Sequence, residues 1–245
     1  MKKQPFFSTS RAAAIAIIIA GVIAIKWCFA DASAVQLDWL LRPASKLVTL
    51  CSGLTFTPLE GQGYYNAAEK ILIAPACSGL NFFLILLATG WCLAAHCPPP
   101  ARRGHWFLGI AASAYAFTLA ANTCRILLAI ALYRWRIAYG PFTPERLHRL
   151  EGVLVYYLCL CLFVMLLSRL LPSSRQRTTD VPASRPRHGW LVASLYLLFT
   201  LGIPLINGAV AKPTLFIEHS LTVLALVIGV ALAVKVWRNC QEVRH

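Results

Sequence analysis

The sequence predicts an all-α, polytopic membrane protein: a bundle of about six spans, a surface helix and a short re-entrant or interfacial helix. Two observations predict this class. Of the 245 residues, 58% are hydrophobic and 13% charged, whereas soluble domains average about 45–50% and about 25%. Apolar stretches of roughly 16 to 22 residues recur, enough to cross a hydrocarbon core about 30 Å thick. Soluble enzymes, disordered chains and disulfide-rich secreted modules are excluded.

The spans follow from these apolar stretches. We expect them at Ala12–Ala30, Gly79–His96, Trp106–Ala121, Leu150–Leu171, Gly189–Val210 and Glu218–Val236. The N-terminus resembles a signal peptide, but no convincing small-residue cleavage site precedes a mature domain, so we expect a retained first span.

The net charge is +14, and in a membrane protein the first explanation is that cytoplasmic loops collect Lys and Arg. With the N-terminus inside, the inner segments hold more basic residues than the outer ones, and most acidic residues fall outside. Both termini are therefore predicted to be cytoplasmic, and no nucleic-acid partner is expected.

Two outer stretches are too polar or too short to cross. Within Asp31–Ala76, a roughly helical spacing of apolar residues predicts a surface helix interrupted near Pro43; the apolar positions are Leu37, Leu41, Val48, Cys51 and Leu54. Short extended segments around glycine turns are expected next. The second stretch, Ile126–Gly140, is apolar and is predicted to be a re-entrant or partly immersed helix.

The chain organisation follows from these elements. Residues 1–171 are predicted to form a membrane core that holds the notable polar residues, and 172–188 a cytoplasmic linker rich in Pro, Ser and Arg. Residues 189–245 are expected to hold two further spans and a cytoplasmic tail.

Three polar residues are predicted at the outer ends of different spans: Cys77, Arg125 and His148. A cysteine attacks as its thiolate, and a nearby imidazolium lowers its pKa and can protonate a leaving amine. An arginine can stabilise a thiolate, an oxyanion or a carboxylate. Ser78 and Gly79 could turn backbone N–H groups and a helix N-terminus toward the thiol.

Taken singly, these residues have commoner explanations. An apolar-flanked cysteine is usually a small core residue, and an interfacial Arg or His usually contacts lipid headgroups. Asn81 and Asn122 are predicted to form interhelical hydrogen bonds, with Asn122 better placed to orient the site, and Gly79 to allow close helix packing. Glu151 could hold the His148 ring or simply be solvated. The other cysteines are interpreted as structural, including Cys124, because adjacent helical residues point about 100° apart.

Together, three motifs in this order resemble the exosortase/archaeosortase family. They are PACSGLNFF, which opens a span, N-x-x-R at Asn122–Arg125, and H-x-x-x-G at His148–Gly152. The similarity covers roughly Val35–Leu171, and the CSGLNFF motif is most similar to the exosortase K-type branch.

The resemblance implies an intramembrane cysteine peptidase or transpeptidase in the bacterial inner membrane, with its active site at the outer face. Its substrates would be exported proteins with a C-terminal signal, namely a short motif such as PEP, a transmembrane helix and a basic tail. Cys77 would be the nucleophile, His148 the base or thiolate partner and Arg125 the transition-state stabiliser. Apart from substrates, only membrane lipids are expected as partners, with no metal or organic cofactor.

Other classes remain open from the residues alone. A small transporter would use Arg125 and His148 to line a pathway, but predicts mid-bilayer charges and repeat symmetry. A non-enzymatic envelope assembly factor would tolerate loss of Cys77. An acyl- or glycosyltransferase would usually need exposed paired carboxylates, and the outer loops offer no obvious pair.

Overall fold

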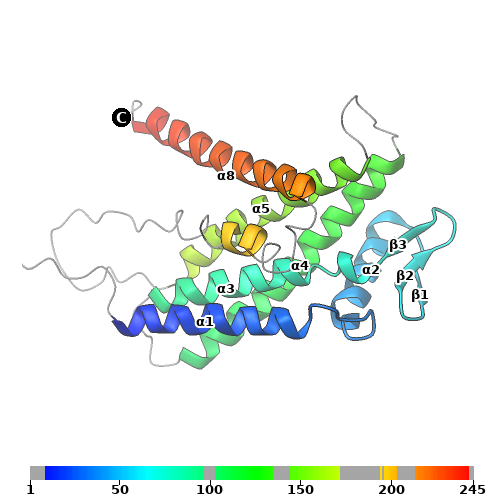
Figure 1. Cartoon of the computed structure of the whole chain (residues 1–245), viewed down its shortest axis with the longest axis horizontal. Helices are drawn as coiled ribbons and strands as arrows, with labels where there is room; N and C mark the ends of the chain where they lie inside the picture. Colours follow the sequence, from blue (N-terminus) through cyan, green and yellow to red (C-terminus); the bar gives the residue numbers. More distant parts are fainter. Residues whose placement is uncertain are drawn as a thin grey trace, which may run out of the picture. The chain divides into compact units, whose positions relative to one another are not determined.

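The computed structural model describes residues 9–96, 103–134, 144–171, 194, 196–202 and 213–242. The described part is mostly helical, as predicted, and includes one small three-stranded sheet. Figure 1 labels the helices and strands, and the chain divides into two compact units. Unit 1 comprises Met1–Ile137 and Val155–Pro186, and unit 2 comprises Ala138–Leu154 and Arg187–His245.

Unit 1 is built around helix α3 (Leu80–His96), which packs against α1 (Thr9–Cys28) and α4 (Arg103–Arg134). Helix α5 (Pro144–Leu170) contributes its C-terminal part to this unit. Three described helices are long and apolar enough to cross a membrane, at Pro75–Ala95, Gly104–Arg134 and Leu150–Leu170, and Ala12–Cys28 and Phe216–Leu232 are shorter apolar helices. Four of the predicted spans therefore coincide with helices α1, α3, α5 and α8 (Pro213–Glu242).

The prediction for α4 was wrong in one respect. We expected a span that ends at Ala121 and a separate short helix at Ile126–Gly140, but α4 continues without a break to Arg134. The sequence between Ala121 and Arg134 contains neither Gly nor Pro, so nothing terminates the helix. Its polar residues Asn122 and Arg125 are buried in unit 1 and lie within the helix instead of at its end.

Helix α2 (Asp38–Ser52) lies where the sequence predicted a surface helix, but Pro43 does not interrupt it. A proline removes the hydrogen bond to the carbonyl four residues earlier, which here belongs to Trp39. The Tyr115 hydroxyl on α4 donates to that Trp39 oxygen at 2.7 Å. The orphaned acceptor is therefore satisfied from the neighbouring helix, which also fixes α2 against α4.

The predicted extended segments form an antiparallel sheet of β1 (Thr57–Leu59), β2 (Gly63–Asn66) and β3 (Ile71–Ile73), in that order. Strand β2 contacts α2, and three side chains join the two elements. The Tyr64 hydroxyl donates to Asp38 at 2.7 Å, and Arg42 pairs with Asp38 at 2.7 Å. Partial desolvation, and then the hydrogen bond to Asp38, raise the pKa of Tyr64.

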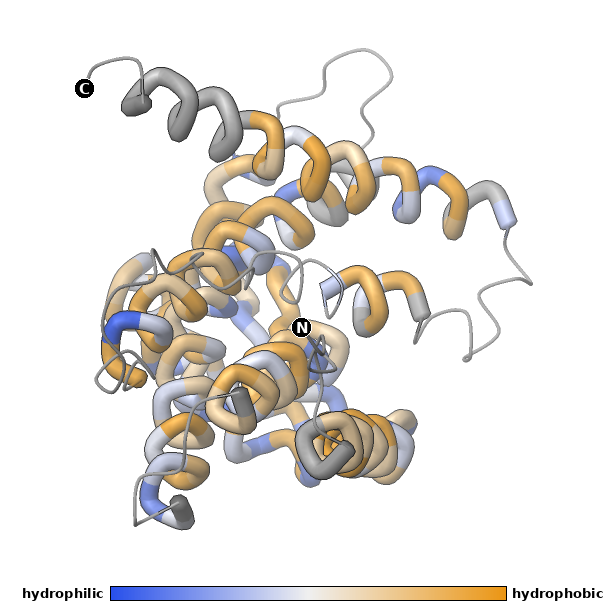
Figure 2. Tube along the Cα trace, turned by 90° about the vertical axis from the view of Figure 1, so that its left-hand side faces the viewer, coloured by the Kyte–Doolittle hydropathy of each residue, from blue (hydrophilic) through white to orange (hydrophobic). Residues whose placement is uncertain are grey.

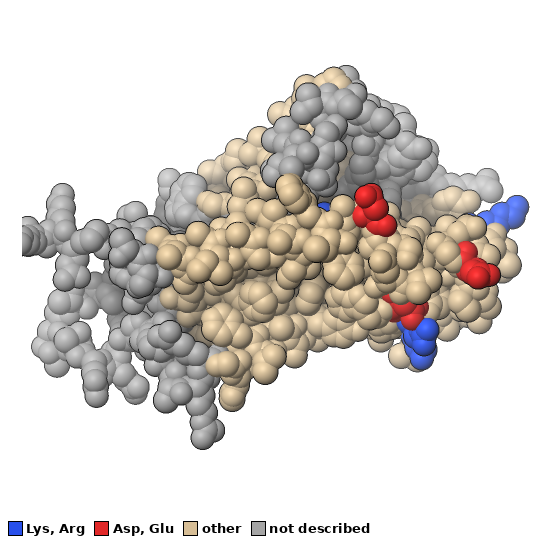
Figure 3. All heavy atoms as spheres, turned by 60° about the horizontal axis from the view of Figure 1, so that its bottom comes forward, with Lys and Arg blue, Asp and Glu red and all other residues tan. Residues whose placement is uncertain are grey.

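The surface of the helices is largely apolar, as expected of a chain in lipid. Coloured by hydropathy, they are hydrophobic along most of their length (Figure 2). On the face shown in Figure 3, most of the visible charged side chains gather at the end with α2 and the sheet. Large aliphatic side chains point outward on α5, namely Leu154, Leu158, Leu162, Met165 and Leu166. Exposed apolar area on this scale indicates contact with lipid.

Unit 2 combines the first turns of α5 with α8 and a short π-helix, η3 (Leu198–Gly202). Tyr196 is buried, and its hydroxyl donates to the Val153 carbonyl on α5 at 3.3 Å. Of the predicted span Gly189–Val210, the structure describes only Ser194 and residues 196–202. The linker 172–188 lies outside the described residues.

Candidate functional site

Cys77 lies on a sharp turn where the chain passes from the sheet into α3. The 3-10 helix η1 (Pro75–Cys77) follows β3 and ends at Cys77. Gly79 then adopts a positive φ of 78°, and its carbonyl accepts the first hydrogen bond of α3, from Phe83 N–H at 3.0 Å. Cys77 is half-exposed. The thiol-bearing residue is thus placed two residues before the N-cap of a helix, where the helix dipole favours negative charge.

Ser78 shapes this turn instead of offering a free donor, which corrects the prediction for its N–H. Its N–H donates to the Pro75 carbonyl at 3.0 Å, and its buried hydroxyl accepts from Leu80 N–H at 3.3 Å. Among the hydrogen bonds of the described residues, none involves the N–H of Gly79. Gly79, not Ser78, is therefore the residue that could present a backbone donor beside the thiol.

The turn lies very close to α4, and Gly79 makes this approach possible. A Cβ atom built on Gly79 would lie 3.2 Å from Thr118 Cγ2 and 3.2 Å from Asn122 Cγ. Both a positive φ and a short contact therefore select glycine here. The predicted role of Gly79 in close packing is confirmed.

Asn122 on α4 connects the turn to two other helical residues. Its side chain is fully buried, and its Nδ2 donates to the Cys77 carbonyl at 2.7 Å. Its Oδ1 accepts from the Tyr156 hydroxyl on α5 at 2.9 Å and from Arg125 Nε at 3.4 Å. The predicted interhelical hydrogen bond of Asn122 is thus confirmed, and one amide fixes the backbone of Cys77 against α4 and α5.

Arg125 is buried one helical turn after Asn122, with 8% of its surface exposed. Its guanidinium carbon lies 5.5 Å from the ring centroid of Tyr156, within the range of a cation–π contact. The Tyr156 ring stacks on Phe82 of α3 at a centroid distance of 4.5 Å. A fixed positive charge and the Cys77 turn are therefore parts of one contact network.

Tyr156 and Phe82 were not singled out from the sequence. The signal for Tyr156 was a phenolic hydroxyl within an apolar span, because a buried hydroxyl usually has a hydrogen-bond partner. Nothing in the pattern distinguished Phe82 from a core residue. The prediction for Asn81 is not confirmed, since its side chain is exposed and forms none of the hydrogen bonds of the described residues.

The remaining cysteines differ in how far their side chains are exposed. Cys124 is exposed whereas its neighbour Arg125 is buried, as expected for adjacent residues on a helix. Cys92 is buried, and burial of this kind suits a small core residue. Cys28 and Cys51 are exposed, Cys159 and Cys161 are half-buried, and all seven cysteines of the described part with a placed side chain are free.

The other two predicted site residues, His148 and Glu151, belong to α5 in unit 2. The backbone of His148 is helical, one turn before Glu151 and Gly152, and its side chain lies outside the described part. The side chain of Glu151 is buried, with 5% of its surface exposed. Glu151 is thus not the solvated carboxylate that the sequence left as one alternative.

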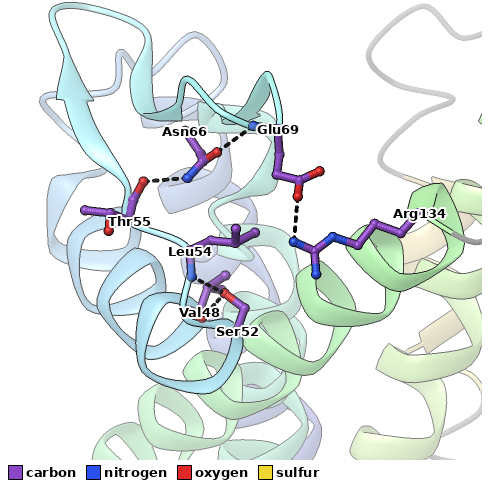
Figure 4. Close-up of polar contacts among 7 residues, drawn as sticks. All are labelled: Val48, Ser52, Leu54, Thr55, Asn66, Glu69 and Arg134. Atoms are coloured by element: carbon purple, nitrogen blue, oxygen red, sulfur yellow. Dashed lines mark hydrogen bonds and ion pairs between the residues drawn. The ribbon is translucent and has the colours of Figure 1, made fainter.

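A second group of polar contacts fixes the sheet segment that precedes Cys77 (Figure 4). The buried Asn66 donates to the Thr55 carbonyl and accepts from Glu69 N–H, at 2.7 and 2.8 Å. The Glu69 carboxylate pairs with Arg134, at the end of α4, at 2.7 Å. The β2–β3 turn is therefore attached to the same helix that holds Asn122 and Arg125.

Comparisons with known proteins agree with the sequence motifs. The family model described as transmembrane exosortase matches residues 7–165. Neither the search of curated proteins nor the search of solved structures gave a match. The matched region includes the turn at Cys77, the buried Asn122 and Arg125, and the His148 segment of α5. Because the match covers more than half of the chain, the protein belongs to the transmembrane exosortase family.

Proposed function

We propose that this protein is a membrane-embedded cysteine peptidase or transpeptidase that cleaves C-terminal sorting signals of exported proteins at the outer face of the inner membrane. Exosortases are membrane protein-sorting proteases, so the general class follows from the family. The observation that carries the specific assignment is the hydrogen bond from Asn122 to the Cys77 carbonyl at 2.7 Å. This bond fixes a half-exposed cysteine in a network with a buried arginine.

In the proposed reaction, the Cys77 thiolate attacks the carbonyl carbon of the scissile peptide bond. The C–N bond breaks, and His148 as imidazolium gives its proton to the leaving amine. The product is a thioester on Cys77, which water or an amine acceptor then resolves with His148 as the base. Arg125 and the N–H of Gly79 are the candidate donors for the negative charge that develops on the carbonyl oxygen.

The length of α4 supports a site near the outer membrane boundary. Its apolar stretch has 31 residues and is therefore about 46 Å long, which exceeds a hydrocarbon core of about 30 Å. In the proposed topology, the Arg134 end protrudes on the outer side, because it pairs with Glu69 of the polar sheet segment. Arg125 lies nine residues earlier, about 14 Å below this end, which places its charge close to the interface.

The proposed substrates are those of the family signal: a motif, a transmembrane helix and a basic tail. The test uses a reporter protein that carries such a tail, taken from an exported protein of the same cell, and follows its processing by size. Cys77→Ala and His148→Ala are expected to abolish processing, since residues that act as a unit lose activity together. Arg125→Lys is expected to retain part of it, because the charge remains but the planar donor set is lost.

The matched controls are the exposed cysteines. Cys124→Ala, adjacent to Arg125, and Cys51→Ala, on the surface of α2, are expected to process the reporter at the wild-type rate. Protection of the buried Cys92 from a thiol-reactive probe is measured on each variant, and shows that the protein remains folded. Normal processing by Cys77→Ala would refute the peptidase assignment and would favour a non-enzymatic role in envelope assembly.

A further inference from the structure

The two edges of the outer sheet differ in their ability to accept another strand. The sheet order is β1-β2-β3, so β1 and β3 are the edge strands. Strand β1 contains Pro58 at its centre, and proline on an edge prevents further strand pairing because it has no N–H. Strand β3 contains no proline and ends four residues before Cys77.

The register shows which backbone groups of β3 point outward. In an antiparallel pair, directly opposed residues alternate between hydrogen-bonded and non-hydrogen-bonded pairs. Pro58 lies opposite Tyr64, and because Pro58 cannot donate, this pair is the non-hydrogen-bonded one. The N–H and C=O of Tyr64 therefore point to the other side, toward its partner Ile73 on β3. By the same alternation, the N–H and C=O of Leu72 point away from the sheet.

A close contact supports this assignment. A Cβ atom built on Gly63 would collide with the Ile73 carbonyl oxygen, so this oxygen points toward β2. Leu72, the next residue toward the N-terminus, consequently points its backbone groups to the free edge. No hydrogen bond joins the Leu72 backbone to other described residues outside the sheet, and its side chain is 38% exposed.

We propose that the segment of the substrate before its scissile bond binds along β3 as a fourth strand, paired through the N–H and C=O of Leu72. The inference rests on the proposed peptidase function and adds how the substrate is held. A peptide that adds to a sheet edge gains affinity from main-chain hydrogen bonds, with specificity left to side-chain pockets. This suits an enzyme that must accept many exported proteins with a common short motif.

The direction of the added strand follows from the direction in which β3 runs toward Cys77. Strand β3 runs toward Cys77 and then into α3, and a substrate motif followed by a transmembrane helix runs the same way. The added strand is therefore parallel to β3. In a parallel pair, one residue bonds through its N–H and C=O to the two partner residues that flank its opposite position. Leu72 alone can therefore supply both hydrogen bonds to the added strand.

The distance from Leu72 to the nucleophile Cys77 is short. From Leu72 to Cys77 the chain advances by five residue steps, two extended and three in the 3-10 helix, which together cover about 13 Å at most. About four extended substrate residues cover this distance. Leu72 would therefore pair with the substrate a few residues before the scissile bond.

The first experiment compares Leu72→Pro with Leu72→Ala in the full-length protein, with the tailed reporter as substrate. Proline removes the outward N–H but no bond to β2, and Pro58 shows that such a position accepts proline. Leu72→Pro is expected to process the reporter about five- to tenfold more slowly than Leu72→Ala, the effect of one lost hydrogen bond, because alanine keeps the N–H. Equal rates for Leu72→Pro and Leu72→Ala would overturn the pairing.

Crosslinking gives a second measurement that does not depend on tolerance of proline. In a Cys77→Ala background, Leu72→Cys is combined with reporters that carry one cysteine at successive positions before the transmembrane helix. Disulfides are expected at alternate positions, the period of a strand. Leu59→Cys on β1 is the matched control, because Leu59 is 39% exposed and Leu72 is 38% exposed, and it should give none. Equal or aperiodic crosslinking of both would overturn the proposal.

The same assays separate this inference from the proposed function. If Cys77→Ala abolishes processing while Leu72→Pro processes at the rate of Leu72→Ala, strand addition fails and the peptidase assignment stands. If Cys77→Ala processes normally, the proposed function fails and this inference fails with it.

Discussion

Gly79 offers the sharpest test of how the Cys77 turn is held, because the chain contains a matched control. Gly79 and Gly53 have nearly equal φ values of 78° and 72°. An L residue in this conformation costs about 1–2 kcal/mol, so Gly79→Ala and Gly53→Ala carry the same backbone strain. Only Gly79 has neighbours within 4 Å of the added Cβ, the side chains of Thr118 and Asn122 at 3.2 Å, whereas Gly53 has none.

The additional effect at Gly79 comes from this contact. Its neighbours must move by a few tenths of an ångström, and overpacking of this kind costs about 1–3 kcal/mol. The displaced side chain is Asn122, whose hydrogen bond fixes the Cys77 carbonyl. If the whole cost appears in the transition state, the processing rate of Gly79→Ala falls about 5- to 150-fold relative to Gly53→Ala.

The assay is processing of the tailed reporter, with the midpoint of thermal aggregation in detergent measured for each variant. Gly53→Ala is expected to lower that midpoint slightly and to leave processing near the wild-type rate. Gly79→Ala is expected to lose processing well beyond its loss of stability. Equal losses of processing in both variants would show that backbone strain alone matters, and would refute a role for the contact between the turn and α4.

Two further predictions concern the attachment of α2 and of the sheet segment to α4. Tyr115→Phe removes the donor of an exposed hydrogen bond to the Trp39 carbonyl and should destabilise the protein by about 0.5–1.5 kcal/mol. Pro43→Ala restores an N–H for that carbonyl and should recover part of the loss, measured as thermal midpoints of the single and double variants. The Glu69–Arg134 pair is partly exposed, at 31% and 44% of its side-chain surfaces. Its coupling energy, measured in a double-mutant cycle of Glu69→Gln and Arg134→Gln, should therefore be below about 1 kcal/mol. The coupling energy should also fall with added salt. A coupling that is unchanged at high salt would contradict that estimate.

The sequence predicted the helical membrane fold, the helix at Asp38–Ser52, the extended segments and the interhelical hydrogen bond of Asn122. These followed from strong signals: apolar length, helical spacing, glycine turns and a polar amide in an apolar helix. The continuity of α2 through Pro43 could not be predicted, because it depends on Tyr115, a residue more than seventy positions away whose hydroxyl replaces the lost donor. Such compensation requires knowledge of which helices are neighbours.

The error at α4 has a different origin and explains part of the site. Hydropathy falls near Asn122 and Arg125, and a fall of this kind usually marks the end of a span. Here the helix continues, and both side chains are buried against the Cys77 turn and Tyr156. Buried polar groups are costly unless they have partners. Where no Gly or Pro follows it, a short polar interval in an apolar helix is therefore better interpreted as a candidate functional site than as the end of the helix.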